Sequence, residues 1–155
     1  MTRFIIVSFI MVCAISTAHT KDLIETAAET GTFNTFLMAA RNTGMIEGLE
    51  STGPWTIFAP TDDAFAQLPP GELRDLLLPQ NLEKLEAVIR HHIIAGEVTS
   101  LDILGKRLEA ITVDGGVLLI DATKDIMVDQ ARVVKADVIA DNGFIHVIDT
   151  VILPK

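Results

Sequence analysis

The spacing of hydrophobic residues changes part-way along this 155-residue chain, close to Leu108. Upstream of that residue, apolar side chains recur at the three- and four-residue steps of an amphipathic helix, as they do in Phe33–Ala40. Downstream they form short runs separated by turn sequences, of which Asp114-Gly115-Gly116 and Asp141-Asn142-Gly143 are the strongest. Strand runs this short cannot each fold alone, so we predict one compact α+β domain over residues 21–155.

Capping and turn residues predict the positions of the individual elements. Thr32 and Gly44 are expected to begin and end the first of these helices. Thr61 is expected to cap a helix whose first turn holds Asp62 and Asp63, where the helix dipole favours anions. The other predicted elements are a short helix over 72–78, a longest helix over 81–95, and strands over 55–59, 111–113, 117–120, 126–128, 131–139 and 144–148.

Residues 1–18 have the layout of a secretory signal peptide. Arg3 gives a positive start, residues 4–15 are an apolar run, and Ser16-Thr17-Ala18 supplies the small residues that a signal peptidase reads. The apolar run is shorter than the roughly 20 residues that a membrane-spanning helix needs. We therefore predict a secreted or periplasmic protein with no stable membrane insertion after signal removal. An uncleaved membrane anchor is the alternative.

Charge and cysteine content narrow the classes of partner and chemistry. The formal net charge is −9 and the sequence has no basic cluster, so the phosphate backbone of a nucleic acid would be repelled. Cys13, the single cysteine, lies within the predicted signal peptide, so the mature chain would have no disulfide and no cysteine nucleophile. The sequence also contains no phosphate-binding loop, dinucleotide fingerprint or calcium-loop pattern, and we predict no cofactor.

His91 and His92 are adjacent in the longest predicted helix. His92 falls on the apolar stripe of that helix, whereas His91 is turned about 100° away, nearer the boundary of the core. Zinc-binding helices place their two histidines four residues apart on one face, so we predict no metal site for this adjacent pair. We expect His92 to be a neutral core residue that is hydrogen-bonded to the Thr61-Asp62 turn.

Catalytic side chains are harder to find in this sequence. His146 alternates with Phe144 and Ile148 and is expected to be a hydrogen-bonded residue of the sheet. Neither Ser51 nor Ser100, the serines that follow the signal, lies in a Gly-x-Ser-x-Gly sequence. We therefore predict that the protein is not an enzyme. The alternative is that two of five aspartates form a catalytic pair of carboxylates, although most of the five are explained as cap and turn residues: Asp62, Asp63, Asp137, Asp141 and Asp149.

Asp137-Val138-Ile139 is the candidate binding element. An aspartate among apolar residues at the end of a strand can expose a carboxylate beside anchored aliphatic side chains, which suits recognition of a partner. The alternative is a strand-terminating aspartate beside two core residues, since aspartate is frequent in turns. Lys124-Asp125-Ile126-Met127 offers a similar arrangement one strand earlier.

Two segments, Thr56–Phe65 and Asn142–Pro154, each place a short apolar strand beside a polar turn or cap, and His91-His92 lies between them. In this order they resemble the two hallmark boxes and the Tyr-His element of the fasciclin domain. The resemblance covers Asp22 to Pro154 and is to single-domain bacterial secreted members more than to the tandem animal matrix proteins. His91 stands where the family usually has tyrosine, and Asp129-Gln130 stands where it usually has a glycine turn.

The resemblance implies a twisted β-wedge of short strands packed with a helical bundle, and a non-catalytic module for adhesion to extracellular or surface proteins, to glycans or to itself. In animal members an Asp-Ile dipeptide just before the second box is linked to integrin binding, and by position it falls on Asp137-Val138. We assign structural roles to the remaining motif residues: Thr61, Asp62, His92, Asn142, Gly143 and His146.

Two alternative functions stay open at this point. One is a ligand-binding or hydrolytic envelope protein that uses acidic residues and histidines in a cleft. The other is a structural envelope protein that acts by self-association, which the acidic charge would oppose at low salt.

Overall fold

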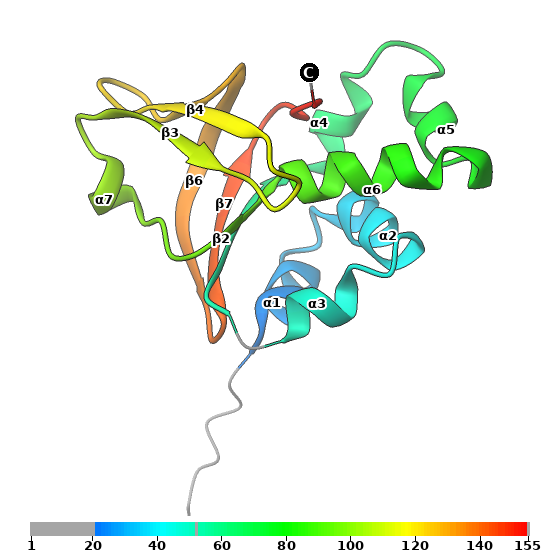
Figure 1. The fold of residues 1–155 in the computed structure, drawn as a ribbon, viewed down its shortest axis with the longest axis horizontal. Helices are drawn as coiled ribbons and strands as arrows, with labels where there is room; N and C mark the ends of the chain where they lie inside the picture. The colour runs from blue at the N-terminus through cyan, green and yellow to red at the C-terminus, as the bar shows by residue number, and fades with distance from the viewer. Residues whose placement is uncertain (1–20, 52, 155) are drawn as a thin grey trace, which may run out of the picture.

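The computed structural model describes residues 21–51 and 53–154, so the predicted signal peptide of residues 1–18 lies outside the described residues. Figure 1 shows most of the helices grouped on one side and the strands on the other. The helical elements are α1 (Leu23–Thr30), α2 (Asn34–Asn42), α3 (Ile46–Glu50), α4 (Asp62–Ala66), α5 (Glu72–Leu76), the 3-10 helix η1 (Pro79–Asn81), α6 (Leu82–His91) and α7 (Ser100–Ile103). The strands are β1 (Trp55–Pro60), β2 (Ile93–Ala95), β3 (Arg107–Ile111), β4 (Val117–Asp121), β5 (Met127–Val128), β6 (Ala131–Ala140) and β7 (Gly143–Ile148).

Within the described residues the strands form one sheet in the order β2-β1-β7-β6-β5-β4-β3. β1 and β7 pair in parallel, with Phe58 opposite His146, whereas all the other neighbours pair antiparallel. The sheet bends back on itself, so that β3 and β4 lie across from β6 and β7 (Figure 1). The N–H of Val113 donates to the carbonyl of Ile93 over 2.9 Å, which brings the end of β3 close to β2.

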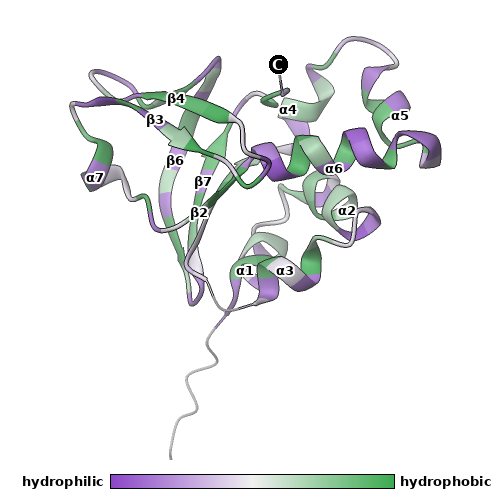
Figure 2. Cartoon of the chain, in the orientation of Figure 1, coloured by the Kyte–Doolittle hydropathy of each residue, from purple (hydrophilic) through white to green (hydrophobic). Residues whose placement is uncertain are grey.

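Two hydrophobic cores lie on opposite faces of β1 and β7. Ile57 and Ile145 face the helices and pack with residues such as Phe36. Phe58 and Ile148 face the other way and pack inside the bent sheet with residues of β4 and β5. Because successive strand residues point to opposite faces, the same two strands serve both cores. Figure 2 shows the central strands as largely hydrophobic, while hydrophilic residues gather on the outer turns of α5 and α6.

The predicted α+β class is confirmed, and so are the strands predicted over 55–59, 131–139 and 144–148, to within a residue at each end. The helix predicted over 81–95 is wrong at its C-terminal end. It stops at His91, and Ile93–Ala95 forms β2, in which Ile94 lies opposite Thr56 of β1. β-branched side chains lose rotamer freedom in a helix and pack well on a pleated surface, so pairing with β1 prevails over another helical turn.

Candidate functional site

Asp137 interrupts β6 at a β-bulge and holds the start of α7. Its φ of 57° lies in the left-handed region, and the β6–β7 register shifts between Lys135 and Val138. The carboxylate turns toward α7, where its Oδ1 accepts the N–H of Ser100 over 2.8 Å. The hydroxyl of Ser100 also donates to Oδ2. The predicted exposed carboxylate is therefore already bound within the chain, and it fixes α7 against β6.

The same contacts keep Asp137 ionised. Its burial would by itself raise the pKa of the carboxyl, but the hydrogen bonds from Ser100 outweigh that effect and lower the pKa below its usual value. The anion then interacts with the N-terminal end of α7, where negative charge is favoured.

The aliphatic neighbours of Asp137 face in different directions. Val138 is half-buried and packs against the helical core, whereas 73% of Ile139 is exposed. On α7, Leu101 directly follows Ser100 and is 80% exposed, and Leu104 at the end of the helix is exposed as well. We name Leu101, Leu104, Asp137 and Ile139 the α7–β6 surface. Its three aliphatic side chains are exposed and its carboxylate is already hydrogen-bonded to Ser100, whereas the sequence predicted a free carboxylate beside anchored aliphatic side chains.

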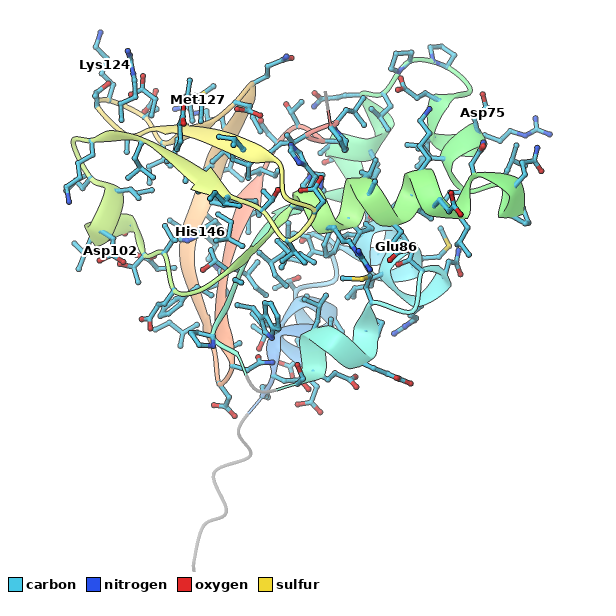
Figure 3. All side chains as sticks on the ribbon, in the orientation of Figure 1. Asp75, Glu86, Asp102, Lys124, Met127 and His146 are labelled. Atoms are coloured by element: carbon cyan, nitrogen blue, oxygen red, sulfur yellow. The ribbon has the colours of Figure 1, made fainter. Side chains whose placement is uncertain are left out.

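His146 supports the bulge from inside the sheet. It is buried, it stacks on Phe58 with ring centroids 5.3 Å apart, and Figure 3 shows it in the strand half of the molecule. Its Nδ1 accepts the N–H of Asp137 over 3.2 Å, and its Nε2 lies 2.6 Å from the carbonyl of Val98. These partners require the neutral tautomer with the proton on Nε2. Both ring nitrogens are thus engaged, which leaves neither free for proton transfer to a substrate.

His92 ties the end of α6 to the C-terminal segment. It is fully buried, its Nδ1 lies 2.6 Å from the carbonyl of Val88, and its Nε2 accepts the N–H of Ile152 over 3.0 Å. The predicted hydrogen bond to the Thr61-Asp62 turn is therefore wrong. The ring is directed along its own helix and toward a segment sixty residues later, which helical periodicity does not reveal. Burial lowers the pKa of His92 to about 4, so the ring is neutral.

The Thr61-Asp62 turn caps two helices at once. Thr61 Oγ1 accepts the N–H of Ala64 over 3.2 Å and so caps α4, as predicted. Asp62 instead reaches α2, where it accepts the N–H of Thr35 over 2.7 Å and the side-chain amide of Asn34 over 3.1 Å. The predicted cap of that helix, Thr32, has no such role. Burial alone would raise the pKa of Asp62, but these hydrogen bonds outweigh it and lower the pKa.

His91 is also buried, although the sequence predicted a position nearer the boundary. Its Nδ1 lies 3.1 Å from the carboxylate of Asp114, in the turn between β3 and β4. Asp114 also accepts the hydroxyl of Thr112 and the N–H of Gly116. This contact clamps the β3–β4 turn to the end of α6. Sequence reasoning identified the turn but not its partner, because the pairing joins two separate elements.

Asn142 joins three segments that are far apart in the sequence. Its side-chain oxygen accepts the N–H of Leu23 over 3.0 Å, and its amide donates to the carbonyls of Leu49 and Ser51 over 2.6 and 3.0 Å. Its backbone carbonyl accepts the N–H of Trp55 over 2.9 Å. The side chain therefore fastens the start of α1 and the end of α3 to the turn between β6 and β7.

Gly143 follows at the point where β7 meets β1. A Cβ at this position would lie 1.9 Å from the backbone oxygen of Trp55, so only glycine fits there without movement of the backbone. The close approach explains why a glycine stands at the first residue of β7.

Histidine and carboxylate side chains do not assemble into a metal centre within residues 21–51 and 53–154, where no three of them are placed to hold an ion. Over the same residues, none of the helices has the length and hydrophobicity needed to cross a bilayer.

Comparison with known proteins shows to which group this architecture is similar. A model of the family described as Fasciclin domain matches residues 31–154. Protein sll1483 of Synechocystis sp. is 41% identical over 134 residues, which cover 85% of this chain and 73% of that protein. A second protein of the same organism, sll1735, is 41% identical over 133 residues, which cover 85% of this chain and 97% of the relative.

Animal proteins match over a smaller share of their length. Human periostin is 33% identical over 123 residues, which cover 78% of this chain and 14% of periostin. Among solved structures, a FAS1 domain pair from the insect cell adhesion molecule Fasciclin I aligns with a TM-score of 0.64 and 21% identity, over 80% of this chain and 46% of that chain. At that identity the alignment is a likeness of fold.

Proposed function

Because the chain belongs to the fasciclin domain family, we propose that it is a secreted or periplasmic interaction module that binds an extracellular protein or polysaccharide without catalysis. Homologues in this family take part in cell adhesion and extracellular interactions. The solved FAS1 domain pair comes from a protein described as a cell adhesion molecule. These relationships support binding rather than turnover as the function.

The α7–β6 surface is the observation that carries this proposal. α7 and β6 both carry exposed aliphatic side chains, and the carboxylate of Asp137 joins the two elements. Large exposed aliphatic residues on neighbouring elements are typical of protein interaction sites. The bulge at Asp137 and the buried ring of His146 fix the backbone beneath them, which lowers the entropic cost of binding.

The buried histidines argue against the hydrolytic alternative. Both ring nitrogens of His92 and of His146 are hydrogen-bonded to backbone groups. A general base needs a free nitrogen within reach of the substrate, and these two rings would have to break structural contacts to provide one. Their hydrogen bonds support a scaffold role.

Site-specific crosslinking of the protein in its own cell-envelope extract tests the proposal. A photoreactive amino acid placed at Leu101 samples the α7–β6 surface, and the same amino acid placed at Leu82, which is exposed on α6, serves as the matched control. We expect a discrete crosslinked partner from position 101 that is absent from position 82 and that is lost when Ile139 is changed to Thr.

Three other results would count against the proposal. Equal crosslinking from both positions would mean that the α7–β6 surface has no special role. A crosslink only to further copies of the same chain would favour self-association. Partner capture that survives at position 101 after Ile139→Thr would separate the interaction from this surface.

A further inference from the structure

The outer face of the β3–β4 hairpin is an apolar surface at the end of the sheet. β3 is the last strand in the sheet order, and the residues of both strands alternate between an exposed outer face and an inner face that is half-buried in β3 and buried in β4. On the outer face Ile111, Val117 and Leu119 are 71%, 50% and 45% exposed. Figure 2 shows β4 as largely hydrophobic. Exposed aliphatic side chains on a regular strand face are a marker of interaction surfaces.

Pairing across the hairpin places these side chains next to one another. Ile111 lies opposite Val117, and Glu109 lies opposite Leu119. Directly opposite residues on one face of an antiparallel pair are in side-chain contact range. We name these four residues the hairpin face. It combines three aliphatic side chains with one carboxylate that has no ion-pair partner among the described residues.

A groove of ≈ 610 Å³ runs beside the hairpin face, and Glu109, Val117 and Leu119 are among its lining residues. Two more carboxylates line it, those of Asp114 and Asp129, together with Pro154 near the C-terminus, and no lysine or arginine does. The volume lies within the range of natural ligand sites. The groove is therefore lined by aliphatic side chains together with three carboxylates and His91.

The two additional carboxylates are fixed in position. Asp129 accepts the N–H of Leu119 over 2.9 Å, and Asp114 accepts the N–H of Gly116 over 3.0 Å. Groups that are already ordered lose little freedom when a partner binds. A cationic side chain that enters the groove would thus meet carboxylates whose positions are set by the β3–β4 turn, which holds Asp114, and the β5–β6 turn, which holds Asp129.

We propose that the hairpin face and its groove form a docking site for a short segment of a partner protein that presents aliphatic side chains next to lysine or arginine. The aliphatic side chains of the partner cover Ile111, Val117 and Leu119, and its cations are attracted by Glu109, Asp114 and Asp129. Charge complementarity selects this occupant, because the groove is lined with carboxylates and the whole chain carries a net charge of −9. The hairpin face shares no residue with the α7–β6 surface, so this inference does not depend on the function proposed above.

Titration of the full-length purified protein with a short capped peptide in which lysine alternates with valine tests the inference. Backbone amide shifts in 15N-labelled protein report where the peptide binds, and isothermal titration gives its affinity. We expect shifts centred on the hairpin face and an affinity that falls as salt is raised. A peptide of the same length in which lysine alternates with serine, and one in which glutamate alternates with valine, should both bind at least about tenfold more weakly.

Variants of the hairpin face provide the second readout. The double substitution Val117→Thr with Leu119→Thr places threonine, which suits a strand, at both exposed positions. We expect it to lower the affinity for the peptide by about tenfold. Glu109→Gln should lower the affinity for the peptide by about threefold and make that affinity less dependent on salt. The matched controls are Leu82→Gln and Glu47→Gln, which change exposed residues on α6 and α3. These controls should leave the affinity unchanged.

Each other outcome would overturn the inference. Absence of binding, shifts confined to other elements, or equal effects of the hairpin-face and control variants would exclude the site. The amide signals of the hairpin face could instead change with the concentration of the protein alone and not on addition of the peptide. In that case the occupant is a second copy of this chain and the proposed partner chemistry is wrong.

Discussion

The carboxylate of Asp137 accepts the backbone N–H of Ser100 over 2.8 Å, and this contact sets a residue in the left-handed region of β6 against the first turn of α7. Asp137 thus connects β6 to α7 through its side chain. Its conformation is costly for a residue with a side chain, so the hydrogen bonds that it makes must offset local strain.

Asp137→Ala should lower the free energy of unfolding by about 1–3 kcal/mol, because it removes the acceptor of the Ser100 N–H and keeps the strained backbone. Asp137→Asn retains an acceptor oxygen and should cost less. Urea unfolding followed by the fluorescence of Trp55 measures both values, and hydrogen exchange of the α7 amides should accelerate in the alanine variant. An alanine variant as stable as the parent would show that the contact contributes nothing.

The pH dependence of stability should carry a contribution from His92. Burial lowers the pKa of its folded form to about 4 from the usual 6.5, so the unfolded chain takes up a proton in this interval that the folded protein does not. The free energy of unfolding should therefore fall as the pH is lowered from about 6.5 to about 4, by up to about 3 kcal/mol. Above pH 6.5 this contribution to stability is fully present.

Urea unfolding of the parent and of His92→Gln over this pH range isolates the effect. The aspartates titrate in both proteins, so the difference between the two profiles reports the ring alone. We expect the parent to show the steeper fall. Profiles that run parallel from pH 7 to pH 4 would mean that His92 is protonated in the folded protein.

Gly143→Ala should destabilise the protein by more than about 2 kcal/mol. The new methyl group would lie 1.9 Å from the backbone oxygen of Trp55, so β1 and β7 would have to separate at their parallel pairing. Gly48→Ala is the matched control, because a methyl group there meets nothing within 4 Å inside helix α3. Alanine favours a helix over glycine, so the control should be neutral or stabilising by up to about 1 kcal/mol. Equal effects of the two changes on the urea midpoint would contradict this account.

Asn142→Ala should cost about 2–4 kcal/mol, since it leaves the N–H of Leu23 and the carbonyls of Leu49 and Ser51 without their partner. Asn142→Asp is the informative comparison. It preserves the acceptor for Leu23 but replaces the donor amide with a negative oxygen facing two carbonyls. We expect it to be at least as unstable as the alanine variant at neutral pH, and to recover part of its stability on acidification. A stable aspartate variant at pH 7 would argue that the two carbonyl contacts are unimportant.

Sequence reasoning predicted most elements because their signals are local. Alternation and turn residues located β6 and β7, and Thr61 identified the start of α4. It failed where the deciding contact is distant in sequence. α2 is capped by Asp62 and not by Thr32, which lies just before the helix in the sequence. Ile93–Ala95 forms β2 because β1 lies beside it.

In the candidate site, too, the residues could be predicted from local sequence but their distant contacts could not. The sequence drew attention to Asp137, His92 and His146, and all three prove to be hydrogen-bonded within the fold. Their partners could not be predicted, since Ser100, Ile152 and Val98 meet them only after the sheet has bent. The exposed leucines of α7 also escaped notice, because four helical residues are too few for a periodic pattern to appear.

β7 is the last strand of the sequence, yet it lies in the middle of the sheet between β1 and β6. A chain that is synthesised from its N-terminus therefore exposes the unpaired edges of β1 and β6 until β7 emerges. The β1–β7 pair also joins residues that are far apart in the sequence, and such long-range pairing forms slowly because a long loop must close first. A nascent chain that stops before Gly143 lacks this central strand, so β1 and β6 keep unpaired edges of the kind that promote aggregation.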